Sequence, residues 1–157
     1  MKRAREMMKD VALKTLLGLV AACNDAAAGY AKAAKSVRHQ DLSNWLTRIS
    51  YERERFAVDL SEAISELEKK PVTDLQEGGI LRGGWPELEQ GLRSKEEQEI
   101  LEECILGDTG TLKHYQDALA QDLPASIRSI VEGQKAAVER DLDSLRSRVS
   151  RHKSEHA

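Results

Sequence analysis

The sequence predicts an all-α fold, a four-helix bundle made of two antiparallel hairpins joined by a long crossover. Ala, Glu, Lys, Leu and Arg supply close to half of the 157 residues, whereas Pro occurs only 3 times, a composition typical of long helices. Apolar residues recur every three or four positions in four segments. Five of the 10 glycines lie between Gly78 and Gly91 and separate two helical halves. The length suits one domain over residues 1–157.

The first half predicts helices over about 7–36 and 42–70. The chain between them is short, which requires an antiparallel hairpin. Asp41 is the expected N-cap of the second helix, and Pro71 cannot continue it.

The second half repeats this plan, with helices expected over about 95–121 and 125–150. Ser94 and Glu97 have the spacing of a capping box at the start of the third helix. Pro124 lies just before the fourth helix, where its missing N–H costs nothing. Two such hairpins again leave one apolar stripe on each helix, and a four-helix bundle buries all four stripes.

The crossover is expected over residues 71–94, and it runs the length of the bundle as in ferritin-like folds. Its glycine-rich part, Gly78–Gly84, lacks the preceding strand and the lysine of a phosphate-binding loop. A flexible connection is the better interpretation. Trp85 and the residues after it predict a short helix packed against the bundle.

Polar residues interrupt the apolar stripe near the middle of each predicted helix. Because the middles of antiparallel helices meet, we expect these residues to share a buried polar layer. Arg53 provides the positive charge that buried carboxylates require, and we expect it to pair with Asp108 or Glu52. The layer is expected to contain Asn24, Asp25, Glu52, Arg53, Asp108 and Gln134.

A metal site of iron or manganese is the alternative for these residues. Di-metal bundles use Glu-x-x-His pairs, but the residues three positions before the four histidines are Ser36, Thr111, Val149 and Lys153. An oxygen-only site would have to use Asp25, Glu52, Glu103 and Asp108. Since Arg53 already supplies a cation there, we expect a structural layer, no metal and no cofactor.

Charge and composition indicate which partners and which cellular compartment to expect. The formal net charge is −3, which argues against a nucleic-acid partner. We expect no membrane-spanning segment and no secretory signal, and therefore a cytoplasmic protein. Cys23 and Cys104 have no metal-type spacing and are interpreted as buried free thiols, although a disulfide between them stays open.

Several short motifs together resemble the ferritin-like bacterial proteins of the DUF2383 type. The resemblance covers about residues 10–147. Its motifs occur in the order Asp25-x-x-x-Gly29-Tyr30-x-x-Ala33-Ala34, Arg53-x-x-Phe56-x-x-Asp59-Leu60, Gly83-Gly84-Trp85-x-x-Leu88, Ile100-Leu101-Glu102-Glu103-Cys104-x-x-Gly107-Asp108, Tyr115-x-x-Ala118-Leu119, Leu123-Pro124 and Gln134-x-x-x-Val138.

The resemblance implies a ferritin-like bundle, a homodimer, and stress-associated expression in some relatives, but no established activity. This chain departs from the family where relatives often place histidines or extra acidic residues. It reads Arg82-Gly83 before the tryptophan, Ile105-Leu106-Gly107-Asp108-Thr109 on the third helix and Leu142-Asp143 on the fourth. These departures argue against a metal role.

We therefore expect a non-catalytic bundle protein. Its homodimer surface is sought first around Trp45, Tyr51 and Trp85. Two alternatives stay open. One is a carboxylate-only metal-binding or di-iron oxidoreductase-type protein, and the other is a helical adaptor that binds a partner protein whose identity the sequence does not define.

Overall fold

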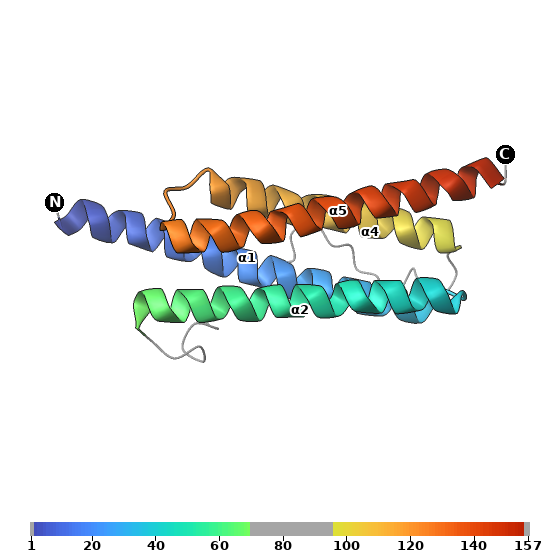
Figure 1. Ribbon diagram of the computed structural model, residues 1–157, viewed down its shortest axis with the longest axis horizontal. Helices are drawn as coiled ribbons and strands as arrows, with labels where there is room; N and C mark the ends of the chain where they lie inside the picture. Colours follow the sequence, from blue (N-terminus) through green and yellow to red (C-terminus); the bar gives the residue numbers. More distant parts are fainter. Residues whose placement is uncertain (1, 70–95, 156–157) are drawn as a thin grey trace.

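Four long helices lie side by side as a bundle (Figure 1). The computed structural model describes the backbone of residues 2–69 and 96–155 and the side chains of residues 10–69 and 96–151. The helices are α1 (Lys2–Ser36), α2 (Gln40–Glu68), α4 (Glu97–Leu119) and α5 (Ala125–Glu155). Within these ranges there is no strand. The prediction of an all-α four-helix bundle is confirmed.

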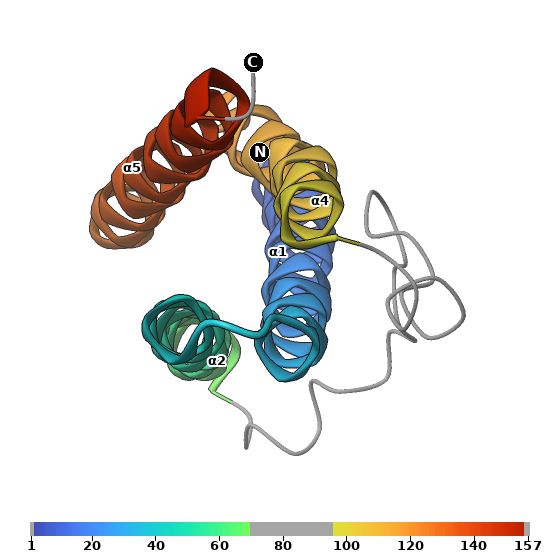
Figure 2. The same cartoon turned by 90° about the vertical axis from the view of Figure 1, so that its right-hand side faces the viewer.

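The helices form two antiparallel hairpins, α1 with α2 and α4 with α5 (Figure 1). The last residue of α2 and the first residue of α4 lie at opposite ends of the bundle. Helix α1 packs against α2 and α4, and α5 packs against α4 and, more loosely, against α2. Helices α2 and α4 therefore occupy diagonal corners (Figure 2). The expected crossover over 71–94, with Gly78–Gly84 and Trp85, falls outside the described residues.

The observed helix ends differ by a few residues from those expected. Helix α1 begins five residues earlier and α5 ends five residues later. Asp41 is not the N-cap of α2, because His39 has the extended backbone of the cap and Asp41 lies in the first turn, where its charge favours the helix dipole. At the other end Lys69 adopts a left-handed conformation with φ 54° and its N–H closes the helix on the carbonyl of Ser65.

The first turn of α4 is tied to the corner between α1 and α2. The Glu97 carboxylate accepts the backbone N–H groups of Arg38 at 2.7 Å and His39 at 3.0 Å. It also contacts Nδ1 of His39 at 2.5 Å. The N-cap of α4 is Glu96, so the predicted capping box of Ser94 with Glu97 is wrong as the start of this helix; Ser94 itself lies outside the described residues. The contact of Glu97 with the corner fixes α4 against the first hairpin.

One continuous apolar core runs through the bundle. Helix α1 contributes many small buried residues, which allow neighbouring helices to approach it closely. Because α1 and α2 lie close together, two hydroxyl groups of α2 reach backbone carbonyls of α1. Ser43 Oγ donates to the carbonyl of Ala34 and Ser50 Oγ to that of Ala27, both at 2.7 Å. The first hairpin is thus joined by hydrogen bonds as well as by apolar packing.

Part of α1 is apolar enough to resemble a membrane span. Residues Asp10–Ser36 are long and apolar enough for a membrane span by length and composition alone. Core helices of water-soluble bundles pass the same test. In this chain Leu16, Cys23 and Tyr30 of that segment are fully buried against the other helices, and 39% of its apolar window is buried.

Candidate functional site

Arg53, in the middle of α2, is the centre of a charged cluster in the core. Its side chain is 0% exposed, as is that of Asp108 on α4. The guanidinium donates to both carboxylate oxygens of Asp108, with Nη2 at 2.9 Å from Oδ2 and Nη1 bound to Oδ1. This is a bidentate pair, the strongest form of side-chain ion pairing.

The other two helices complete the cluster. From α1, the hydroxyl of Tyr30 donates to Asp108 Oδ2 at 2.6 Å, and the guanidinium of Arg53 stands 5.4 Å from the centre of the Tyr30 ring. From α5, Asp141 Oδ2 accepts a second bond from Arg53 Nη2 at 2.9 Å. We call Tyr30, Arg53, Asp108 and Asp141, one residue from each helix, the charged layer.

Glu52 and Arg140 form the outer edge of this layer, between α2 and α5. Arg140 Nη2 donates to Glu52 Oε2 at 2.8 Å and to Asp141 Oδ1 at 3.3 Å. Burial and the neighbouring Asp141 carboxyl raise the pKa of Glu52 to about 7. When Glu52 is protonated, the two arginines balance the carboxylates of Asp108 and Asp141. The cluster can therefore reach zero net charge near neutral pH.

Arg53 and Tyr30 of the charged layer keep their protonation states over the ordinary pH range. Burial alone would lower the pKa of Arg53, but the charge and hydrogen bonds of Asp108 raise it well above its usual value. Burial and the Asp108 charge also raise the pKa of Tyr30 well above its usual value. Arg53 thus stays a cation and Tyr30 stays a phenol that donates its proton.

A second polar layer without charges lies next to the first. The hydroxyl of Tyr115 donates to Gln134 Oε1 at 2.8 Å and lies 3.0 Å from the Cys23 sulfur. Gln134 Nε2 in turn donates to the backbone carbonyl of Phe56 at 3.3 Å. We call Cys23, Tyr115 and Gln134 the neutral layer. Its residues are each seven positions from a member of the charged layer, or about 10 Å along a helix.

The structure brings together some of the residues that the sequence singles out and separates others. Arg53 and Asp108 meet directly, Glu52 lies at their edge, and Gln134 is buried one layer away. Asn24 is exposed, so its expected place in the layer is wrong, because the helix turns this side chain toward solvent. Asp25 and Glu103 are only partly buried.

Tyr30, Asp141, Cys23 and Tyr115 are the residues that sequence reasoning missed. Aromatic and thiol groups are indistinguishable from ordinary core residues in a hydrophobic pattern, and Asp141 stands in a polar stretch of α5. Their shared signal is the spacing of seven residues between Cys23 and Tyr30, Asp108 and Tyr115, and Gln134 and Asp141. That repeat places polar groups on one inward-facing stripe.

The donor set does not fit iron or manganese. Both oxygens of Asp108 are already engaged by Arg53, and Tyr30 shares one of them. Within residues 10–69 and 96–151, no three side chains of His, Cys, Asp or Glu are grouped so that they could hold a metal ion. A divalent cation here would also face the positive charge of Arg53.

A family model described as "Domain of unknown function (DUF2383)" matches residues 2–121, which contain α1, α2 and α4 and most of the charged layer. No curated protein matches the chain.

Proposed function

The chain belongs to the DUF2383 family, and from this premise we propose that it is a non-catalytic bundle protein of ferritin-like topology with a metal-free core. In this proposal the charged layer fixes the register of the four helices, that is, their positions along the bundle axis relative to one another. The protein acts through its outer surface. One observation carries the proposal: the buried guanidinium of Arg53 pairs with the carboxylates of Asp108 and Asp141 in the middle of the bundle.

The chemical state of the buried groups supports a non-catalytic role. Burial raises the pKa of the Cys23 thiol to about 11, and burial with the Asp108 charge also raises the pKa of Cys104. Thiols in this state are weak nucleophiles at neutral pH. The carboxylate of Asp108 and the phenol of Tyr30 are bound to each other. These groups stabilise the core and are not poised to attack a substrate.

Metal loading of the full-length protein tests this proposal. The purified chain is incubated with Fe(II) under nitrogen or with Mn(II), desalted, and analysed for bound metal and thermal unfolding. We expect far less than one ion per chain and an unchanged unfolding midpoint, because a ligand that bound the native state would raise it. Near-stoichiometric iron or manganese that is lost in Asp108→Ala would instead establish the carboxylate-only metal alternative.

We also propose that the protein forms a homodimer through the outward face of α2. Tyr51 and Val58 lie two turns apart on this face and are 65% and 46% exposed. Sedimentation of the wild type and of Tyr51→Ala/Val58→Ala tests this: we expect a dimer that dissociates in the double variant. A monomeric wild type would contradict the homodimer. It would favour the adaptor alternative, in which the same face binds a different protein.

A cytoplasmic location and stress-associated expression complete the proposal. Cys23 and Cys104 are both free and buried, as is common in reducing compartments. The stress association rests on the family resemblance. Cell fractionation and measurement of protein level before and after oxidative stress test both points, and an extracytoplasmic or constant protein would contradict them.

A further inference from the structure

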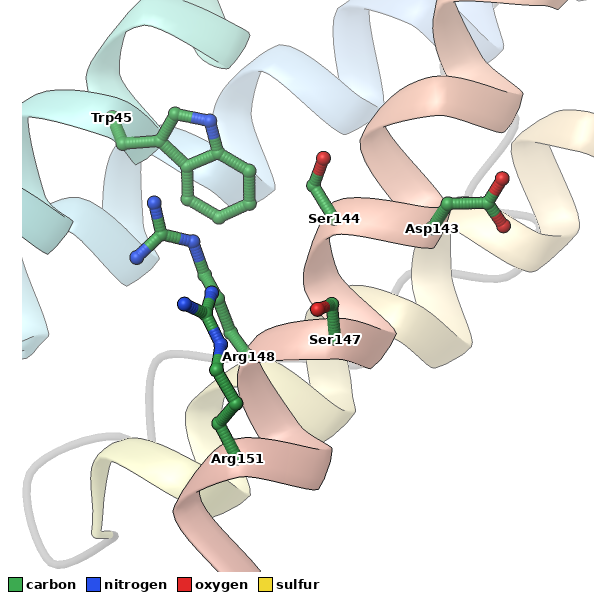
Figure 3. A pocket seen from close by; sticks show the side chains of 6 residues that line it. All are labelled: Trp45, Asp143, Ser144, Ser147, Arg148 and Arg151. Carbon is green, nitrogen blue, oxygen red and sulfur yellow. The ribbon is translucent and has the colours of Figure 1, made fainter.

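A shallow groove lies between α2 and the C-terminal part of α5 (Figure 3). Its volume is about 310 Å³. It is lined by Trp45, Asp143, Ser144, Ser147, Arg148 and Arg151. The groove thus combines the aromatic ring of Trp45 from α2 with two hydroxyl groups and two guanidinium groups, which lie on adjacent turns of α5.

The two arginines of the groove form no ion pair within the described residues, although Asp41 and Glu97 line a second pocket together with them. The Arg148 guanidinium lies over the Trp45 ring, 4.2 Å from its centre, and Figure 3 shows the Arg151 guanidinium next to it. Among the described residues neither has a carboxylate partner. Burial and the positive charge of Arg151 lower the pKa of Arg148. Two like charges side by side are unfavourable, and an anion between them removes that repulsion.

The remaining groups of the groove are consistent with an anion. Ser144 and Ser147 have no hydrogen-bond partner among the described residues, whereas hydroxyls such as Thr47 on α2 bond to the carbonyl four residues earlier. Both serines can therefore donate to a ligand. The carboxylate of Asp143 points away from the arginines (Figure 3) and lies 3.7 Å from Arg146, so it does not neutralise them.

We propose that this groove binds the phosphate group of a small ligand, through the guanidiniums of Arg148 and Arg151 with Ser144 and Ser147 as further donors. Guanidinium groups donate in a planar fork that matches phosphate oxygens. The Trp45 ring holds Arg148 in place before the ligand arrives, which lowers the entropy lost on binding. The site does not depend on the proposed function, since it shares no residue with the charged layer.

Fluorescence titration of the full chain tests the proposal. Trp85→Phe leaves Trp45 as the single tryptophan, and its emission reports on the groove. Inorganic phosphate and glycerol 2-phosphate are added at constant ionic strength, with chloride as the control anion. We expect saturable binding with a dissociation constant of about 1 mM or tighter. Equal binding of both compounds indicates recognition of the phosphate group itself, and preference for glycerol 2-phosphate indicates an organic phosphomonoester.

Two matched arginine variants on α5 decide between a site and a general charge effect. Arg151→Ala should weaken binding about tenfold or more, because it removes charge-assisted hydrogen bonds. Arg146→Ala changes the net charge equally but lies outside the groove, and should leave the affinity within about twofold. The proposal is overturned if no saturable change occurs, if chloride gives the same change, or if the two variants bind phosphate equally.

Discussion

Arg53 and Asp108 join helices at diagonal corners of the bundle, so their bidentate pair crosses the core instead of bridging two neighbouring helices. Both side chains are 0% exposed. Removing either partner alone leaves a buried, uncompensated charge, which costs far more than the pair contributes over an apolar substitute. Because Tyr30 and Asp141 bind the same pair, all four helices must keep one relative height for these bonds to form.

Removal of one hydroxyl from the charged layer should lower stability. Tyr30→Phe deletes the donor to Asp108 at 2.6 Å, and loss of a hydrogen bond to a charged group costs about 1.5–3 kcal/mol. Urea unfolding measures this free energy. Tyr51→Phe is the control, since it removes a hydroxyl from a side chain that is 65% exposed and keeps the aromatic ring of the proposed dimer face, and it should change stability little. Equal stability of both variants would show that the Tyr30 hydroxyl contributes nothing.

The neutral layer should respond to a similar deletion. Tyr115→Phe leaves the amide oxygen of Gln134 without its donor at 2.8 Å and separates Cys23 from its partner. An unsatisfied buried amide oxygen costs about 1–3 kcal/mol. We expect a loss in this range by urea unfolding and an unchanged helical circular dichroism spectrum. A variant as stable as the wild type would mean that water replaces the lost bond.

Glu97 should stabilise the protein only while it is ionised. Burial is the largest single effect and raises the pKa of Glu97, but the hydrogen bonds from His39 and Arg38 together lower this pKa below its ordinary value. A lowered folded-state pKa gives stability that is present above the unfolded value and lost as pH falls through the folded value. Glu97→Gln should cost about 0.5–1 kcal/mol at pH 7 after screening by solvent.

The cost of Glu97→Gln should shrink as the pH is lowered below about 4. Exposed Glu99 in the same turn provides the control variant Glu99→Gln. Thermal unfolding followed across pH measures both. A pH-independent cost of Glu97→Gln would contradict the assigned role of the carboxylate.

Glu52 should have the opposite pH dependence. Its folded-state pKa is raised to about 7 from 4.5, so the folded protein holds more protons than the unfolded chain between these values. Stability from this group is complete below pH 4.5 and declines as the pH rises to about 7. Glu52→Gln keeps a neutral side chain at all pH values and should remove this decline.

The difference between wild type and Glu52→Gln should therefore appear only at higher pH. Above pH 7 we expect Glu52→Gln to be more stable by about 1 kcal/mol or less, because solvent screens a partly exposed group. Glu54→Gln, on the exposed side of α2, should retain the wild-type pH profile. A wild-type profile in Glu52→Gln would assign the decline to another group.

The helices and their order were predictable from the sequence because apolar spacing and Gly or Pro positions act locally. From the sequence, Arg53 was expected to pair with either Asp108 or Glu52, so its central pairing with Asp108 was predicted only as one of two alternatives. The place of Asn24 was not predictable, since a helix position one residue from the buried Cys23 faces solvent. Asp141 and Tyr30 join the cluster through tertiary packing, which no single helix pattern encodes.

A double-mutant cycle on Arg53 and Asp108 tests the central claim most directly. The free energy of unfolding is measured by urea for wild type, Arg53→Met, Asp108→Leu and the double variant. We predict that each single substitution costs about 3–5 kcal/mol, and that the double variant loses less than the sum by about 1–3 kcal/mol. Costs that add to within about 0.5 kcal/mol would contradict the claim that these two buried charges neutralise each other.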